Sequence, residues 1–218
     1  MPRTARASVG NVYYHVLNRG NGRAEVFHKP ADYAAFLDLM AAANDRLPVR
    51  ILGYALMPNH FHLVIWPCGD GDLSRWMQWL LTSHVRRYHR HYQGSGHVWQ
   101  GRFKAFPIEQ DEHLLAVLRY VERNPLRAGL VDRAEEWMWS SLAWRTRGQR
   151  PGMLAEWPLP CPPGWVEHVN SVQSEAELAS LRKSVERGMP FGGAEWSQRT
   201  AEELGLESTM RSRGRPRL

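Results

Sequence analysis

Two runs of strand-forming residues, 49–57 and 60–66, are separated only by Pro58 and Asn59. Both runs are rich in β-branched, aromatic and other apolar residues, which favour strands, while proline and asparagine favour a turn. A two-residue connection joins antiparallel neighbours, so the stretch 49–66 predicts a β-hairpin. This hairpin fixes the middle of the fold and restricts what can pack on either side of it.

The segments that flank the hairpin alternate between strand and helix. We expect strands at 11–18 and 102–108, and helices at 30–47, 72–92 and 109–124. Pro48 is expected to end the first of these helices, and Pro125 the third. The order β-α-β-β-α-β-α predicts an α+β fold, a split βαβ unit of the ferredoxin or RRM type with an antiparallel sheet and packed helices.

The composition changes after Trp144. Five prolines fall within residues 151–163 and predict a stiff, proline-rich linker. Two short helices are expected beyond it, at 174–187 and 193–204, and a basic tail follows them. We therefore divide the chain into a domain at 1–150, a linker at 151–164 and a helical C-terminal extension at 165–218.

Positive charge is concentrated in two stretches that contain no acidic residue, in a chain of net charge +6. These stretches are the window 73–108, with Arg75, Arg86, Arg87, Arg90, Arg102 and Lys104, and the tail, with Arg211, Arg213, Arg215 and Arg217. Clustered positive charge is typical of proteins that bind a polyanion, so we predict that these residues bind nucleic acid. Some of the aromatic residues in the window can stack on unpaired bases, whereas Trp76 is expected in the core. A solvated helix face and a flexible tail are the alternative.

The composition also excludes several classes of protein. Hydrophobic residues make up 43% and aromatic residues 11% of the 218 residues, which supports a folded core and excludes global disorder. No apolar run is long enough for a membrane span, and the first residues lack the apolar block of a signal peptide. Two cysteines are too few for a disulfide framework. We therefore expect a cytoplasmic protein with no membrane partner.

His60 and His62 occupy alternate positions of the strand that follows the turn. Residues i and i+2 of a strand point to the same face, so the two imidazoles converge while Phe61 turns into the opposite layer. Two nitrogens at this spacing can bind one divalent ion. A pair of half-buried sheet histidines is the alternative, and the spacing alone leaves both interpretations open.

A second set of polar side chains borders the apolar stripe of the helix expected at 109–124. The stripe consists of Leu114, Val117, Leu118 and Val121. At about 100° per residue, His113, Tyr120 and Asn124 fall on one flank of this stripe. Tyr120 and Asn124 are one turn apart and project together, so the helix can present both to the two histidines. A boundary tyrosine and a C-cap asparagine before proline are the alternatives.

Three motifs, in this order along the chain, resemble those of the REP-associated tyrosine transposases, relatives of the single-tyrosine HUH transposases of small insertion sequences. They are Met57-Pro-Asn-His-Phe-His62, Gly96-His-Val-Trp-Gln-Gly-Arg-Phe103 and Tyr120-Val-Glu-Arg-Asn-Pro-Leu-Arg-Ala-Gly129. The runs 196–206 and 213–217 also look like that family's tail, so the resemblance covers the whole chain. It implies that residues 1–150 form an HUH catalytic domain.

The resemblance assigns roles to four residues. His60 and His62 match the metal ligands, and Asn124 matches the polar third ligand of Mg²⁺ or Mn²⁺. Tyr120 matches the nucleophile, whereas His113 has no role in the motif. The four positions are the same set that strand alternation and helical spacing bring together.

The resemblance also implies an activity and a partner. The implied reaction is metal-dependent cleavage and rejoining of single-stranded DNA at palindromic, REP-like hairpins through a 5′-phosphotyrosine link, as in DNA transposition and recombination. One phosphodiester is exchanged for another ester, so no ATP is needed, in agreement with the lack of a Walker-type motif. The resemblance implies a monomer more than a dimer, although insertion-sequence relatives are dimers that exchange the tyrosine helix, and it implies a cytoplasmic, nucleoid-associated protein. The run 213–217 resembles an AT-hook core, or else is a tail that binds any nucleic acid.

Two other functions stay open on the sequence. A protein of the same fold can bind nucleic acid without catalysis, although the intact Tyr120, His60 and His62 argue against that. A metal-dependent phosphodiesterase would use water, and it would leave a free 5′-phosphate and no protein–DNA adduct. Formation of a covalent adduct separates the transposase from both.

Overall fold

The computed structural model describes residues 8–148 and 152–211. Four strands form one antiparallel sheet in the order β2-β3-β1-β4. They are β1 (Tyr13–Arg19), β2 (Val49–Met57), β3 (His60–Pro67) and β4 (Lys104–Ile108). The predicted hairpin is the pair β2–β3. The predicted split βαβ fold is confirmed, with β3 and β1 at the centre of the sheet.

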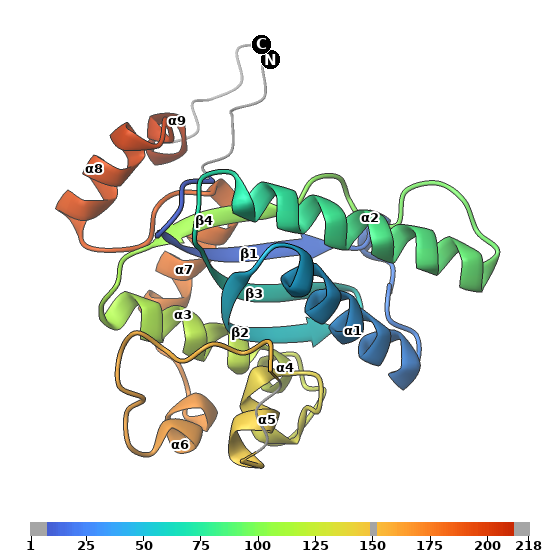
Figure 1. Cartoon of the computed structure of the whole chain (residues 1–218). Coiled ribbons are helices and arrows are strands. Elements are labelled where there is room, and N and C mark those ends of the chain that lie inside the picture. The colour runs from blue at the N-terminus through green and yellow to red at the C-terminus, as the bar shows by residue number, and fades with distance from the viewer. Residues whose placement is uncertain (1–7, 149–151, 212–218) are drawn as a thin grey trace, which may run out of the picture.

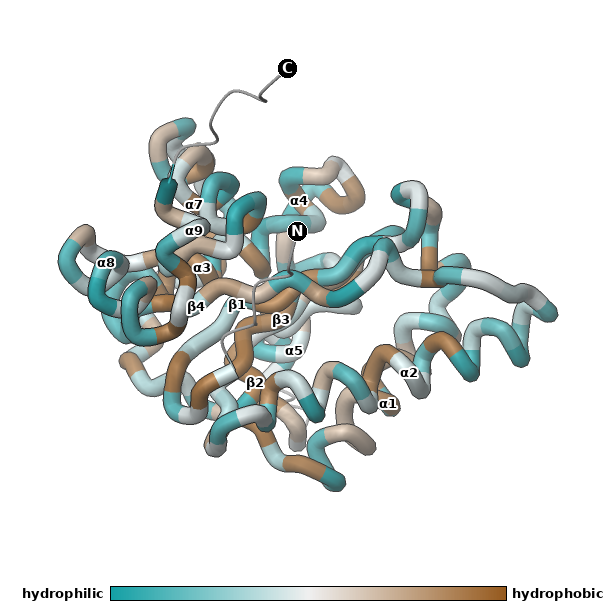
Figure 2. Tube along the Cα trace, turned by 90° about the horizontal axis from the view of Figure 1, so that it is seen from above, coloured by the Kyte–Doolittle hydropathy of each residue, from teal (hydrophilic) through white to brown (hydrophobic). Residues whose placement is uncertain are grey.

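Helices cover both faces of this sheet. α1 (Pro30–Arg46) and α2 (Asp72–Tyr92) lie side by side on one face, and α3 (Glu112–Glu122) lies on the other. The view from above shows the strands running between the α1/α2 pair and α3 (Figure 2). We call these the α1/α2 face and the α3 face. The α1/α2 face holds the two crossover connections, because α1 links β1 to β2 and α2 links β3 to β4, and each of these connections passes over one intervening strand.

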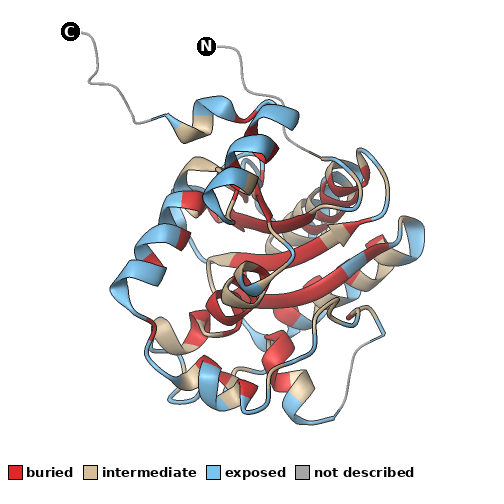
Figure 3. Ribbon diagram, turned by 90° about the vertical axis from the view of Figure 1, so that its left-hand side faces the viewer, coloured by how far each residue is buried: buried red, intermediate tan, exposed pale blue. Residues whose placement is uncertain are grey.

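Strand alternation divides the buried residues between the two faces, and most of the sheet is buried (Figure 3). On β3, Phe61, Leu63 and Ile65 belong to the core under α1 and α2. Val64 belongs to the core under α3, and His62 is on the same side of the strand. Strands that are buried on both faces consist almost entirely of apolar residues. Polar side chains such as His62 are therefore exceptions on the α3 face.

The close approach of α3 to the sheet depends on Gly53. A β-bulge interrupts the β2–β3 register between Ile51 and Gly53. A Cβ atom at Gly53 would lie 2.8 Å from the Leu118 Cδ2 atom of α3. A side chain at this position would push α3 away from the hairpin, so the glycine sets the distance between them.

The end of the third predicted helix differs from the prediction. α3 ends at Glu122, and a further helical turn, α4 (Asn124–Arg127), follows it. Pro125 therefore does not stop the helix, because a proline in the first turn of a helix lacks only an N–H that has no partner there. Asn124 is consequently the first residue of α4 rather than a C-cap of α3.

The rest of the chain wraps around the α3 side of the sheet, as Figure 1 shows. The elements after α4 are η2 (Ala134–Glu136), α5 (Ser141–Thr146), α6 (Trp165–Asn170), α7 (Glu175–Arg187), α8 (Ala194–Glu203) and α9 (Glu207–Met210). A short helical turn, η1 (Asn21–Arg23), separates β1 from α1. Within the described ranges, no helix is both long and apolar enough to cross a membrane.

Segments from downstream in the chain cover both edges of the sheet. The Ala155 N–H donates to the Ile51 carbonyl at 2.8 Å, and Leu154 in the proline-rich stretch is only 2% exposed. At the β4 edge, the Phe191 N–H donates to the Pro107 carbonyl at 2.9 Å. An open strand edge invites pairing with another chain, so these contacts close the sheet.

Candidate active site

His60 and His62 lie on the α3 face of β3, with ring centroids 5.0 Å apart. His60 is partly exposed and His62 is buried. The Nδ1 atom of His60 lies 2.6 Å from the Asn59 Oδ1 atom, and Nδ1 of His62 lies 2.8 Å from the Nε2 atom of His15. Each ring is thus held through Nδ1, which leaves Nε2 as the nitrogen that can bind a cation.

His15 is a site residue that the sequence analysis missed. It is fully buried on β1, and its ring centroid lies 5.0 Å from that of His62 and 6.2 Å from that of Tyr120. When His62 binds a cation through Nε2, its Nδ1–H donates to His15 and fixes the ring. A partial signal was present in the sequence, since His15 is a polar residue in the middle of a strand of apolar and aromatic residues.

All three histidines favour the neutral form. Burial lowers the pKa of His15 to about 3. Burial, followed by the positive charges of Arg19 and Arg127, lowers the pKa of His60 to about 4. The pKa of His62 lies well below its ordinary value, mainly because of burial and then because of the neighbouring His15 and His60. A neutral imidazole is the form that binds a metal, so the site needs no proton removed at neutral pH.

Tyr120 projects from α3 toward these rings. Its ring is 5% exposed and lies edge-on to His62, with centroids 5.8 Å apart. The hydroxyl makes no hydrogen bond within the portion of the chain that the structure describes. The guanidinium carbon of Arg127 lies 4.3 Å from the ring centroid. The phenol is therefore held by packing while its oxygen stays available to an incoming group.

Asn124 lies at the start of α4, one turn beyond Tyr120, and is 5% exposed. Its Nδ2 atom is buried and has no partner among the described residues. A buried carboxamide without a partner is costly, and rotation by half a turn exchanges its nitrogen and oxygen. A carboxamide oxygen and neutral imidazoles with Nε2 available are donor types that suit a divalent cation.

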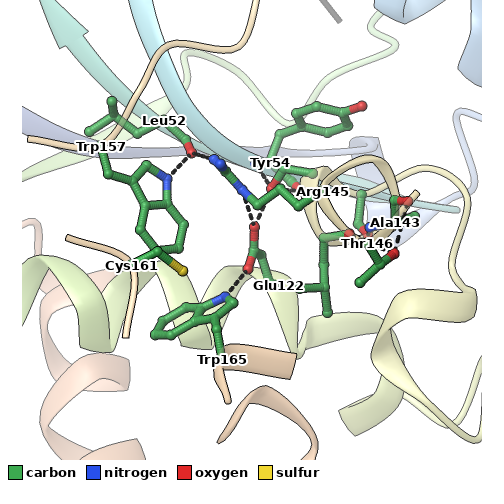
Figure 4. Close-up of polar contacts among 12 residues, drawn as sticks. Leu52, Tyr54, Glu122, Ala143, Arg145, Thr146, Trp157, Cys161 and Trp165 are labelled. Carbon is green, nitrogen blue, oxygen red and sulfur yellow. Dashed lines mark hydrogen bonds and ion pairs between the residues drawn. The ribbon is translucent and has the colours of Figure 1, made fainter. Parts of the chain in front are cut away.

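A buried polar network fixes the helix that carries Tyr120 (Figure 4). The Glu122 carboxylate has no exposed surface. It accepts hydrogen bonds at 2.7 Å from both Ser141 Oγ and Trp165 Nε1, and it lies 3.4 Å from Arg145 Nε. The network joins α3 to α5 and α6, so the C-terminal region supports the site from behind.

Arg119 of α3 and Arg123, the C-cap residue of α3, also connect α3 to α6. The Arg119 guanidinium donates to the carbonyls of His168 and Ser171 at 2.8 and 3.1 Å. Arg123 Nη1 donates to the carbonyls of Val169 and Asn170 at 2.8 and 2.5 Å. The last carbonyls of a helix lack partners within it, so these arginines cap the end of α6 and tie it to α3.

The predicted DNA-binding residues of the window 73–108 separate into two groups. Arg86, Arg102 and Lys104 line one groove of about 1210 Å³ between α2 and the segment 96–105. Arg75 pairs with Asp72 at 2.6 Å, and Arg87 lies 3.9 Å from the buried Asp32. Arg90 is exposed near the end of α2. The structure thus brings three of the six together in one concave surface.

A backbone hydrogen bond connects the lining of this groove to the end of β1. The Gln100 N–H, in its lining, donates to the Arg19 carbonyl at 2.8 Å, and Arg19 is the cross-strand partner of His60. Trp76 is buried as expected, and so are Trp99 and Phe103, which are 5% exposed. Most of the large aromatic surface in the window is therefore core, which leaves charge as the main feature of the groove.

The basic tail is described only at its start. Arg211 is exposed just after α9. Arg213, Arg215 and Arg217, which were predicted to bind DNA, lie outside the described residues.

His113, which the helical wheel placed beside Tyr120, belongs to a different cluster at the start of α3. Its Nδ1 atom lies 2.8 Å from Asp111 Oδ1 and 4.0 Å from Glu109 Oε2. These three side chains could hold a cation, but they already have partners in the protein. Asp111 caps α3, and Glu109 accepts from the Gly193 N–H at 2.7 Å. The seven residues from His113 to Tyr120 span roughly 10 Å of helix, so this cluster is separate from the histidine site.

Comparison with known proteins gives consistent matches. A family model described as "Transposase IS200 like" matches residues 8–124, which include β1 to β4, α3 and Asn124. The REP-associated tyrosine transposase of Escherichia coli (strain K12) is 24% identical over 135 residues, 61% of this chain and 76% of that protein. A putative REP-associated tyrosine transposase of Haemophilus influenzae is 27% identical over 108 residues, 44% of this chain and 61% of that protein.

One solved structure is similar in fold. It is that of a REP-associated tyrosine transposase bound to a REP hairpin, with a TM-score of 0.53 and 23% sequence identity. The match covers 71% of this chain and 92% of that one.

Proposed function

This chain belongs to the IS200-like transposase family, and on that premise we propose that it cleaves and rejoins single-stranded DNA at palindromic, REP-like hairpins. The family implies cleavage and transfer of DNA strands. Two curated relatives bear the name of REP-associated tyrosine transposases, and the similar structure holds a REP hairpin. A protein that acts on chromosomal DNA works in the cytoplasm at the nucleoid, and we propose that location and a monomer.

In this proposal His60, His62 and Asn124 hold a divalent cation, Mg²⁺ or Mn²⁺. Their support as ligands is the shared face, the two Nε2 atoms and the unpartnered carboxamide. When bound, such a cation polarises a phosphate oxygen and helps to orient the strand. Three protein ligands leave coordination positions for that oxygen and for water.

Tyr120 is the proposed nucleophile. Its oxygen attacks the scissile phosphorus, so a bond forms between that oxygen and phosphorus, and the bond from phosphorus to the 3′-oxygen breaks. The phenol gives up its proton and the leaving 3′-oxygen gains one. The product is a 5′-phosphotyrosine link and a free 3′-hydroxyl. A 3′-hydroxyl from another strand end reverses the step and rejoins DNA without ATP.

The proposed path of the strand is the groove lined by Arg86, Arg102 and Lys104. Each such side chain can neutralise a phosphate and release counterions. The exposed Arg90 and Arg211, together with Arg75, Arg87 and the arginines of the tail, are proposed to add to this electrostatic attraction. We propose that residues 1–150 form the catalytic domain and that residues 151–164 link it to the C-terminal region. Residues 165–218 are proposed to support α3 and to add to DNA binding.

One observation carries the proposal. The Tyr120 phenol lies beside His62, on the side of the sheet that also holds His60 and the unpartnered carboxamide of Asn124, and a separate groove lined by basic side chains lies along α2. A protein that only bound DNA would need the groove but not this costly polar cluster. A hydrolase would need the cation but not the phenol.

The test is an incubation of the full chain with labelled single-stranded hairpins from its own genome, with Mg²⁺ or Mn²⁺, analysed on a denaturing gel. We expect a label that migrates with the protein after denaturation and that is absent in EDTA. DNA binding without an adduct would indicate a binding protein. A free 5′-phosphate without an adduct would indicate hydrolysis by water.

A further inference from the structure

Two arginines flank the candidate active site, and neither was singled out by the sequence analysis. Arg19 is the last residue of β1 and the direct cross-strand partner of His60, which places it on the α3 face. Arg127 is the last residue of α4, and its guanidinium lies over the ring of Tyr120 at 4.3 Å. One arginine therefore approaches from the sheet and the other from the helix.

Both guanidinium groups have buried hydrogen-bond donors without partners. Nε of Arg19 and Nη1 of Arg127 are buried and unpaired within residues 8–148 and 152–211. No carboxylate in the same ranges forms an ion pair with either side chain. A buried charged donor is costly to leave unsatisfied, so these positions indicate an anion that is present when the protein acts.

The neighbouring arginines of α3 and its C-cap have partners for their guanidinium groups, so a buried, unpaired guanidinium donor is unusual in this part of the structure. Arg119 and Arg123 lie one helical turn apart near the end of α3. Their guanidinium groups donate hydrogen bonds to the carbonyls at the end of α6. Arg127 follows them by one further turn, but its side chain has no such acceptor among the described residues. Its position over Tyr120 is thus not explained by packing of the C-terminal region.

The chemistry of the site specifies the anion. Arg19 lies opposite His60 in the sheet and Arg127 lies over the Tyr120 ring, so two positive side chains flank the site before any cation enters. A phosphodiester carries one negative charge, and more charge collects on its non-bridging oxygens in the transition state of transfer. The planar guanidinium offers paired donors that match two such oxygens.

We propose that Arg19 and Arg127 grip the non-bridging oxygens of the scissile phosphate from opposite sides and are catalytic residues of the strand-transfer step. The Arg127 guanidinium, which lies over the Tyr120 ring, also offsets the negative charge that the phenol gains as it loses its proton. This inference rests on the proposed function, because it names the group of the DNA substrate that the two arginines contact. The bonds made and broken are those of the Tyr120 attack.

The first test compares Arg19→Gln and Arg127→Gln with the control Arg182→Gln in single-turnover adduct formation. Arg182 lies on α7 and pairs at the surface with Glu175 at 3.8 Å. We expect a rate loss of about 100- to 1,000-fold for each site variant, as for removal of one transition-state donor, and no loss for the control. Lysine at either position should restore only part of the rate, because it lacks the paired donors.

Metal affinity separates a catalytic role from a structural one. Mn²⁺ binding without DNA should be equal or tighter in Arg19→Gln and Arg127→Gln, since a repelling charge has been removed. A methylphosphonate at the scissile position should reduce the difference between wild type and each variant to a few-fold. Wild-type rates, or a rate loss matched by equal losses of Mn²⁺ affinity and melting temperature, would overturn the proposal.

A binding measurement decides the matter even if the wild type forms no adduct. In the Tyr120→Phe background, each glutamine substitution should lower the slope of log K against log salt on single-stranded DNA by about 0.7, and Arg182→Gln should not. An unchanged slope would show that the two arginines contact no phosphate. An adduct failure with a changed slope would instead count against the proposed reaction alone.

Discussion

The two faces of the sheet are built from different kinds of residue. The α1/α2 face buries apolar and aromatic side chains such as Phe36, Phe61 and Trp76. The α3 face also has an apolar core, but it includes His15, His62, Glu122 and Asn124, all between 0% and 5% exposed. Buried polar groups cost free energy unless they are paired or bind a ligand. The α1/α2 side also buries Asp32 and Asp72, but both carboxylates accept hydrogen bonds within the protein. The α3 face differs because its polar residues include the unpartnered Asn124 Nδ2 atom and two histidines beside Tyr120, and this is where we propose that the molecule acts.

The α1/α2 face also contains a buried histidine, His84, which can be compared directly with His62. His84 is 2% exposed, and burial lowers its pKa to about 4. Its ring packs against Phe36 and Trp99, at centroid distances of 5.1 and 5.2 Å. Among the described residues, its ring contacts are with aromatic side chains and not with a second histidine, so burial and a lowered pKa alone do not make a site.

The largest expected effect distinguishes tyrosines on the two faces. Tyr120→Phe should abolish cleavage and adduct formation but keep DNA binding within a few-fold, because only the nucleophilic oxygen is lost. Tyr88→Phe is the control, since its hydroxyl lies 2.9 Å from His28 on the α1/α2 side. An adduct formed by Tyr120→Phe at the wild-type rate would show that another tyrosine is the nucleophile.

Histidines on the two faces should differ in the next largest effect. His60→Ala or His62→Ala should remove metal-dependent cleavage, as EDTA does to the wild type. His15→Leu should weaken Mn²⁺ binding by about 10- to 100-fold, because His15 holds the ring of His62.

The matched control is His84→Ala. It should lower the free energy of unfolding by roughly 2–4 kcal/mol through loss of packing, without changing Mn²⁺ affinity. Calorimetric titration with Mn²⁺ and denaturant unfolding supply the two readouts. Full cleavage in EDTA would show that His60 and His62 are structural, like His84.

Glu122 offers a test of how the α3 face is held in place. Glu122→Ala should reduce the free energy of unfolding by about 3–5 kcal/mol, because Arg145 loses its buried carboxylate and Trp165 its acceptor. Cleavage should fall as well, since α3 loses one of its connections to α6. Glu175→Ala, which breaks an exposed pair with Arg182, should have little effect on stability. Equal unfolding midpoints for the two variants would contradict this role of Glu122.

The smallest effect concerns the tail. Deletion of residues 208–218 removes four arginines and no acid. The slope of log K against log salt should fall by up to about 0.7–0.9 for each lost phosphate contact. Cleavage at saturating DNA should be unchanged, because the support for α3 comes from α6, upstream of the deletion. Loss of cleavage at saturation would mean that the tail helps to build the site.

Much of the fold was predictable because local signals agree with the tertiary structure. The Pro58–Asn59 turn and the apolar runs define the hairpin, and α2 has the predicted bounds. The end of α3 was predicted wrongly, because Pro125 can either stop a helix or begin a new turn, and only packing of α4 decides. The contact of the proline-rich stretch with β2 also lies beyond local signals, since Leu154 and Ile51 are distant in sequence.

For the site, strand alternation and helical spacing suggested which side chains share a face, and the structure has His62 next to Tyr120. The residues that were missed, His15, Arg19 and Arg127, come from β1 and α4. Their significance depends on cross-strand register and on the approach of α4 to Tyr120, which no sequence period reveals. The roles of Tyr120, His60, His62 and Asn124 stay predictions until chemistry is measured.

The most direct measurement of the central claim is the identity of the residue that becomes linked to DNA. After incubation with a cleavable hairpin and nuclease trimming, trypsin should cut after Arg119 and Arg123 and release the tetrapeptide that begins at Tyr120. That peptide contains a single tyrosine, so its mass identifies the linked residue without ambiguity. We expect a nucleotide joined through 5′-phosphate to Tyr120. A nucleotide on any other peptide, or free 5′-phosphate with no modified peptide, would contradict the assignment of the α3 face as the catalytic one.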